Sequence, residues 1–196
     1  MKLVIHGGCG AREDQKTSFL HYHQELKQII NDAYEYFLHN KNAIEAAIYT
    51  ARLLEDNPVF NAGTGSRIQQ DGQIRMSASI MDSQRNKFAG VINIQDIQHP
   101  IDVAFKLLDQ HNSVLCGAEA TQYAHAILNF PSYNPMTENR WQEYQSLKKA
   151  PFEIVHEAGQ NPFEFDYFEP VRSPAGVCRS TPRWPPQNHR HAVPGR

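Results

Sequence analysis

The chain has 196 residues, a length that suits one domain with its own hydrophobic core, alone or with a tail. A formal charge of −2 offers no electrostatic basis for binding nucleic acid or an anionic membrane, and the three cysteines have no metal-like or disulfide-like spacing. The N-terminal apolar run, 3–5, is too short for a signal peptide, and no later run reaches membrane-spanning length. We therefore expect a cytoplasmic globular protein.

The first sixty residues predict a short strand and two helices. Residues 2–5 form an apolar strand. Apolar side chains at spacings of three and four indicate an amphipathic helix over about 18–39. Asn42 is placed to cap a second helix that runs to about residue 55, and Pro58 stops it because proline cannot extend the helical hydrogen bonds.

The middle of the chain predicts antiparallel strands, and the remainder predicts helices. Asp71-Gly72, between strands 66–70 and 73–81, is a hairpin signal in which both turn positions take positive φ. Residues 87–95 predict a third strand. Helices are expected over 100–110, 117–129 and 137–149. This order predicts an α+β fold in which helices pack on the faces of a sheet.

The sequence lacks the residue spacing that nucleotide binding or metal binding by side chains would require. The glycine-rich run 6–10 follows a strand, as a phosphate-binding loop does, but it lacks the lysine and hydroxyl of a P-loop and does not match the dinucleotide fingerprint. The histidine pairs 21/23 and 189/191 have no Cys, Asp or Glu at a recognised metal-binding spacing. We expect the glycines to form a tight turn and the first histidine pair to lie on a helix surface.

Three sequence blocks point to a family. They are Ile5-His6-Gly7-Gly8, Asn61-Ala62-Gly63-Thr64-Gly65-Ser66 and Met76-Ser77-Ala78-Ser79-Ile80-Met81-Asp82. In these blocks the chain resembles the plant-type (type III) asparaginases, or isoaspartyl peptidases, N-terminal-nucleophile hydrolases that cut their own precursor before a threonine. It departs from their pattern at Ser77 and Ser83, where an aspartate and a glycine are usual. The resemblance implies half of a four-layer α-β-β-α sandwich, whose other half belongs to a second subunit.

The resemblance also implies where the site lies. His6, Gly7, Gly8 and Asn61 would form one wall of the active site. Backbone carbonyls of a folded-back loop would bind a structural sodium ion, a hard cation that prefers oxygen ligands. Position by position, these carbonyls belong to Leu54, Glu55, Asn57, Phe60, Ala62 and Thr64. No cofactor is expected to be required.

The nucleophile is the residue that the sequence does not provide. In the family it stands in a Gly-Thr-Val-Gly motif, and no threonine of this chain is followed by Val-Gly. An N-terminal threonine uses its own free amine as the base, and a cut before Thr64 would sever the signature loop. We therefore expect no catalytic residue in this chain. Arg196 ends a Pro-Gly-Arg that matches a family motif, but three residues match easily by chance and it is not assigned as a ligand.

The composition changes near the end of the chain. Residues 171–196 contain five arginines and no lysine, and no acidic residue follows Glu169. We expect 1–158 to be the first-subunit portion and 159–196 to be an irregular Pro/Arg-rich tail, either disordered or translated out of frame. The change falls where the family's nucleophile motif should begin, which favours the second interpretation.

The implied activity is hydrolysis of the side-chain amide of asparagine and of β-aspartyl dipeptides. This chain is expected to be inactive alone and to have a second subunit of the same family as its partner. The alternative is a non-catalytic protein that pairs with a separately encoded or full-length partner. Neither nucleic acid nor a membrane is expected to bind.

Overall fold

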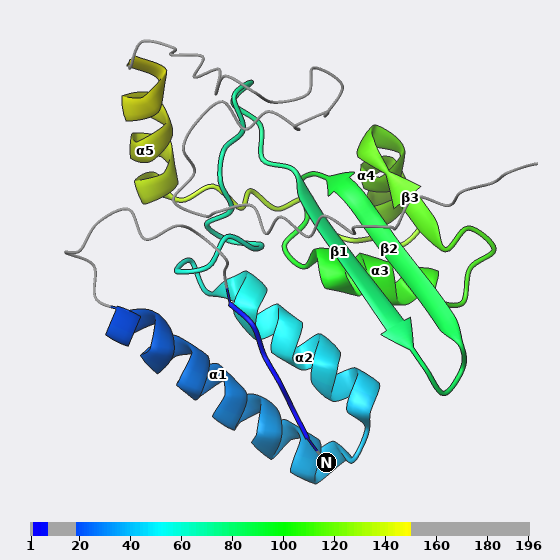
Figure 1. Ribbon diagram of the computed structural model, residues 1–196. Helices are drawn as coiled ribbons and strands as arrows, with labels where there is room; N and C mark the ends of the chain where they lie inside the picture. Colours follow the sequence, from blue (N-terminus) through cyan, green and yellow to red (C-terminus); the bar gives the residue numbers. More distant parts are fainter. Residues whose placement is uncertain (1, 8–18, 150–196) are drawn as a thin grey trace, which may run out of the picture.

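The computed structural model describes residues 2–7 and 19–149, which form a mixed α+β fold, as predicted (Figure 1). The elements of these residues are α1 (Phe19–Asn40), α2 (Ala43–Asp56), β1 (Met76–Asp82), β2 (Lys87–Ile94), α3 (Pro100–Leu107), β3 (Val114–Cys116), α4 (Gly117–Ala126) and α5 (Glu138–Lys149). The tail predicted over 159–196 lies outside the described residues, so its character stays a prediction.

Helices α1 and α2 lie side by side as a helical hairpin (Figure 1). The predicted cap of α2 is confirmed, because Asn42 Oδ1 accepts hydrogen bonds from the amides of Ile44 and Glu45 at 3.1 and 3.4 Å. The rings of Tyr36 and Tyr49 stack with their centroids 4.3 Å apart, which fixes one helix against the other.

The three strands form one sheet in the order β1-β2-β3. The antiparallel pairing of β1 with β2 agrees with the prediction, whereas β3 was not predicted and pairs with β2 in parallel. Helices α3 and α4 cover one face of this sheet (Figure 1). The buried side chains between them include Ile80, Val91, Ile94, Val103, Leu107, Ala120 and Ala124.

The opposite face of the sheet carries four exposed apolar side chains, beside the exposed Ser79, in the part of the chain that the structure describes. Met81 is paired with Phe88, and Gly90, two residues further along β2, is paired with Val114. The exposed fractions of Met81, Phe88 and Val114 are 69%, 53% and 45%, and Ile92 of the same face is 48% exposed. Since side chains alternate between the faces of a strand, these side chains lie opposite α3 and α4.

Two predicted strands were wrong. Residues 2–7 have no strand hydrogen bonds, although Leu3 and Ile5 are partly buried in the alternating pattern of a strand. Residues 66–70 likewise belong to no strand. An extended segment becomes a strand only where a neighbouring backbone supplies hydrogen bonds, and the local sequence does not determine that neighbour.

The predicted turn at Asp71-Gly72 exists, although no strand precedes it, and its form differs from the prediction. Gly72 has φ of 84°, whereas Asp71 does not have positive φ. The amide of Gly72 donates to the carbonyl of Gln69 at 2.9 Å, and the amide of Gln69 donates to the carbonyl of Gln73 at 2.8 Å. The loop therefore has three residues, with a left-handed glycine last, instead of two. Helices α3 and α4 also end three residues before their predicted ends, at Leu107 and Ala126.

Candidate functional site

The segment after α2 folds back onto the end of that helix. The amide of Thr64 donates a 2.7 Å hydrogen bond to the carbonyl of Glu55, and the amide of Phe60 donates to the carbonyl of Asn57 at 3.1 Å. Phe60 is buried, with 5% of its surface exposed. The helix ends here because Pro58 has no amide hydrogen to donate. This is the folded-back loop that the sequence predicts around residues 54–64.

Two glycines of the signature block are required by this loop. Gly63 has φ of 57°, and a Cβ placed on it would lie 2.2 Å from the carbonyl oxygen of Glu55. Gly65 has φ of 84°, and a Cβ there would lie 2.8 Å from the carbonyl oxygen of Pro58. Both positions combine a left-handed backbone with a contact too close for any side chain, so only glycine fits.

Asn61 and Thr64 have different environments within the loop. The side chain of Asn61 is exposed, and its Oδ1 accepts a 2.8 Å hydrogen bond from the amide of Arg67. The hydroxyl of Thr64 is hydrogen-bonded to the hydroxyl of Tyr133 at 2.8 Å. Thr64 therefore helps to hold the loop, whereas the carboxamide of Asn61 is available at the surface.

The structure brings part of the N-terminal segment to this loop. A Cβ placed on Gly7 would lie 2.6 Å from Leu26 Cδ2 and 2.7 Å from Phe60 Cε1, so Gly7 packs directly on α1 and on the loop. His6 beside it is exposed. Gly8, the third residue of the predicted wall, lies outside the described residues.

A distant segment, Tyr133 to Glu143, supports the loop from the other side. The amide of Gly65 donates to the carbonyl of Pro135 at 2.8 Å, and Arg140 Nε donates to the carbonyl of Gly65 at 2.6 Å. The carboxylate of Glu143 then lies between two guanidinium groups, 2.8 Å from Arg140 and 3.1 Å from Arg67. No motif in the sequence predicts these partners, because they lie far apart along the chain.

The carboxyl group of Glu55 is an unexpected buried group beside the loop. Oε1 accepts a 3.2 Å hydrogen bond from the amide of Ile101, near the start of α3, while Oε2 has no partner among the described residues. Burial raises the pKa of the Glu55 carboxyl from 4.5 to about 8; the hydrogen bond from Ile101 opposes this, and the nearby Asp102 and Asp56 carboxylates add to it. At neutral pH this carboxyl group is therefore mostly neutral in the folded chain.

The sequence match decides the family. Residues 1–165 match the family described as Asparaginase. The chain belongs to the asparaginase family. Among its relatives, the chain is 43% identical over 143 residues to an isoaspartyl peptidase/L-asparaginase of Nostoc sp., a match that covers 73% of this chain and 45% of the relative. The predicted resemblance is thereby confirmed.

Other asparaginase relatives give the same result. A plant-type L-asparaginase of Pyrococcus furiosus is 30% identical over 184 residues, which cover 89% of this chain and 58% of the relative. An isoaspartyl peptidase/L-asparaginase of Synechocystis sp. is 42% identical over 143 residues, 73% of this chain and 43% of the relative. The chain thus spans about half the length of the curated relatives that it matches.

The loop contains the six backbone carbonyls that are predicted to bind sodium. The helical partner of the Leu54 carbonyl would be the amide of Pro58, which does not exist. Among the described residues, no donor reaches the carbonyls of Phe60, Ala62 or Thr64. The carbonyls of Glu55 and Asn57 each accept one hydrogen bond and keep a second lone pair. Carbonyl oxygens in need of a partner are the kind of ligand that a hard cation takes, so their chemistry is compatible with sodium, and the site itself stays a prediction.

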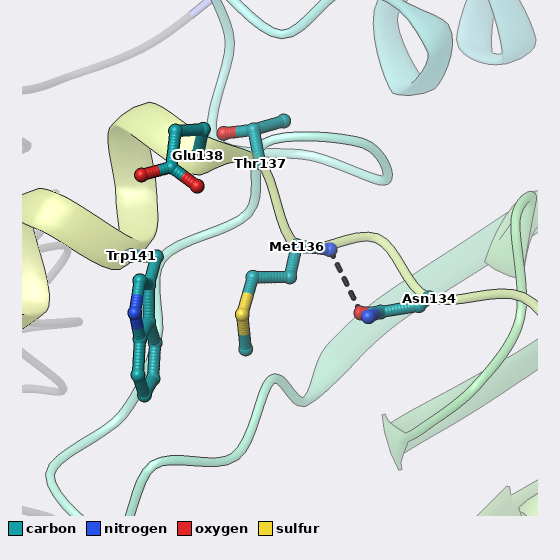
Figure 2. Close-up of a pocket in the computed structure, with 5 residues that line it drawn as sticks. All are labelled: Asn134, Met136, Thr137, Glu138 and Trp141. Carbon is teal, nitrogen blue, oxygen red and sulfur yellow. Dashed lines mark hydrogen bonds between the residues drawn. The ribbon is translucent and has the colours of Figure 1, made fainter.

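A shallow hollow of about 360 Å³ lies at the start of α5 in this chain. Figure 2 shows the side chains of Met136 and Trp141 close together, while Asn134 Oδ1 accepts a 3.1 Å hydrogen bond from the amide of Met136. Thr137 and Glu138 complete the lining. Its residues flank Pro135, so the hollow is a neighbour of the loop that contains Gly65.

Among the described residues we looked for membrane-spanning helices and for side chains arranged to bind a metal ion. No helix among them is long and apolar enough to cross a membrane. No group of three or more His, Cys, Asp and Glu side chains among them is arranged to hold a metal ion.

Proposed function

We propose that this chain forms one wall of the active site of a threonine-type amidohydrolase that acts on asparagine and on β-aspartyl dipeptides. The 196 residues contain no Gly-Thr-Val-Gly, so the nucleophile comes from a second polypeptide segment. In this reaction the threonine hydroxyl attacks the amide carbonyl, its free amine takes the proton, and hydrogen-bond donors stabilise the tetrahedral intermediate.

The observation that carries the proposal is the geometry of the signature loop. The contact between Thr64 and Glu55 closes the loop, and two glycines that admit no side chain shape it. This leaves the Asn61 carboxamide exposed while its oxygen is held by the Arg67 amide. A polar side chain fixed at one end and open at the other suits a site wall, because it is oriented before substrate binds.

The open face of the sheet supports a two-subunit sandwich. Two sheets that pack face to face bury their inner side chains between them. The exposed apolar side chains of Met81, Phe88, Ile92 and Val114 share one face that is uncovered among the described residues, as the inner face of such a sandwich would be before its partner sheet binds. We therefore propose that the second subunit contributes both the nucleophile and a sheet that covers this face.

A structural sodium ion is part of the same proposal. Its ligands would be the backbone carbonyls of the six residues between 54 and 64 that the family resemblance implies. When bound, the ion would satisfy carbonyl oxygens that lack a hydrogen-bond partner or keep a second lone pair, and it would hold the loop in its folded-back form. It takes no part in the chemical step.

Activity with and without a second subunit tests the proposal. The chain is assayed alone and after co-production with the second subunit of the Nostoc relative, by ammonia release from asparagine and leucine release from β-Asp-Leu. We expect no turnover by the chain alone and turnover by the pair, reduced when Asn61→Ala is introduced. Turnover by the pure chain would reveal a nucleophile within these 196 residues and overturn the proposal.

The second candidate is a non-catalytic protein that binds a full-length partner. The uncovered sheet face is compatible with this role as well. Binding to a full-length relative, with no activity in any pairing, would favour it. Reading the DNA after this segment for Gly-Thr-Val-Gly, in any frame or as a separate chain, distinguishes the two candidates directly.

A further inference from the structure

The backbone of Gly65 is held through both its amide and its carbonyl by one distant segment. Its amide donates to the Pro135 carbonyl at 2.8 Å, and the carbonyl of the same residue accepts from Arg140 Nε at 2.6 Å. These two hydrogen bonds help to fix the orientation of this residue, which also lies close to the backbone of Pro58. Both come from residues that lie before or within α5.

The guanidinium of Arg140 is itself oriented by a second contact. Its Nη1 donates to Glu143 Oε2 at 2.8 Å, and the other oxygen of Glu143 lies 3.1 Å from Arg67 Nη2. The side chains of both arginines are 19% exposed and that of Glu143 is 30% exposed. A carboxylate shared by two half-buried guanidinium groups makes charge-assisted hydrogen bonds, which are stronger than exposed single pairs.

The contacts form a continuous chain of hydrogen bonds and ion pairs that ends at Asn61. Arg67, held by Glu143 through its side chain, donates its backbone amide to Asn61 Oδ1 at 2.8 Å. The path therefore runs from the Gly65 carbonyl through Arg140, Glu143 and Arg67 to the Asn61 carboxamide. A change at Arg140 reaches Asn61 through the loop backbone and through the shared carboxylate.

We propose that Arg140, together with Glu143, is a positioning residue for residues 61–67 and sets the orientation of the Asn61 carboxamide. The inference rests on the proposed function in one respect only, because that function is what makes this loop the wall of an active site. The arginine acts at a distance: it holds the Gly65 carbonyl directly and Arg67 through Glu143, and the Arg67 amide in turn holds Asn61. Neither the signature block nor its spacing identifies Arg140.

Amide hydrogen exchange on the full chain tests this proposal without any substrate, so its failure is separable from failure of the proposed function. In Arg140→Gln we expect the amides of Gly65 and Arg67 to exchange about tenfold faster, as for loss of a charge-assisted hydrogen bond. The amide of Thr64, which is bound to Glu55 at the other end of the loop, should keep its exchange rate. Arg140→Lys retains one charged donor and should restore part of the protection.

Two further variants separate positioning from general loosening. Glu143→Gln keeps the size of the side chain and should speed exchange at the same two amides. Arg85→Gln is the matched control, because Arg85 pairs with Asp82 and Asp109 on the surface, away from the loop. Unchanged exchange at Gly65 and Arg67 in Arg140→Gln would overturn the inference. Equal acceleration of Thr64 and of the β1 and β2 amides, without recovery in Arg140→Lys, would also overturn it.

Discussion

The amide of Thr64 donates a 2.7 Å hydrogen bond to the carbonyl of Glu55, and this contact closes the loop that contains Asn61. The loop is possible because Gly63 lies directly against the same carbonyl oxygen. The end of α2, the signature block and the buried Glu55 carboxyl group are therefore one structural unit. Changes to any of the three should affect the others.

Gly63→Ala should destabilise the fold strongly. The new Cβ would lie 2.2 Å from the carbonyl oxygen of Glu55, and the residue would also hold an unfavourable φ of 57°. Gly117→Ala is the matched control, since Gly117 has φ of 61° with nothing within 4 Å of a Cβ. We expect about 1 kcal/mol for the control and about 3 kcal/mol for Gly63→Ala in urea unfolding. Equal losses would show that the backbone near Glu55 relaxes freely.

Glu55→Gln should remove a pH dependence of stability. The pKa of the Glu55 carboxyl is raised from 4.5 to about 8 in the folded chain, chiefly by burial. Between these values the folded state keeps a proton that the unfolded state has lost, so the free energy of unfolding falls as pH rises from about 4.5 towards 8. Each unit of pKa difference is worth about 1.4 kcal/mol.

The side-chain amide of the Glu55→Gln variant resembles the neutral carboxyl group. The free energy of unfolding of this variant should therefore depend less on pH. Glu45→Gln, an exposed position on the same helix, serves as the control and should leave the profile unchanged. Unfolding in urea at several pH values measures the effect. A wild-type profile that rises from pH 5 to pH 8 would contradict the prediction.

Sodium should stabilise the chain beyond the effect of ionic strength. Replacing choline chloride by sodium chloride at constant ionic strength should raise the free energy of unfolding by about 1.4 kcal/mol when sodium is at ten times its Kd. Pro58→Ala provides an amide for the Leu54 carbonyl and should weaken this dependence. Thermal unfolding in the two salts measures it, and identical curves for the wild type would rule out the ion.

The open sheet face should limit solubility without contributing to the core. Phe88→Thr and Ile92→Thr place a polar residue of high strand propensity on β2 and should raise the soluble concentration, with little loss of stability. Ile94→Ala, on the covered face with 0% exposure, should instead cost about 2–5 kcal/mol. Solubility that does not respond to the two threonine substitutions would indicate that this face is covered.

Local patterns in the sequence predicted most of the helical elements. The spacing of apolar residues predicted α1, and Asn42 and Pro58 predicted the start and end of α2, because helices and their caps depend on residues a few positions apart. The glycines of the signature block indicated a tight loop for the same reason. The family resemblance depended on these short blocks and was confirmed by the match over residues 1–165.

Tertiary structure alone decided the contacts between distant residues. Strand β3 has three residues, too few for a period to show, and exists only because β2 pairs with it. Residues 2–5 have the composition of a strand but no strand partner among the described residues. The burial of the Glu55 carboxyl and the hydrogen bond from Arg140 to Gly65 likewise join residues far apart in the chain. Local sequence encodes the backbone preference of each segment, whereas the packing of segments onto one another determines which groups lose water and which partners they find.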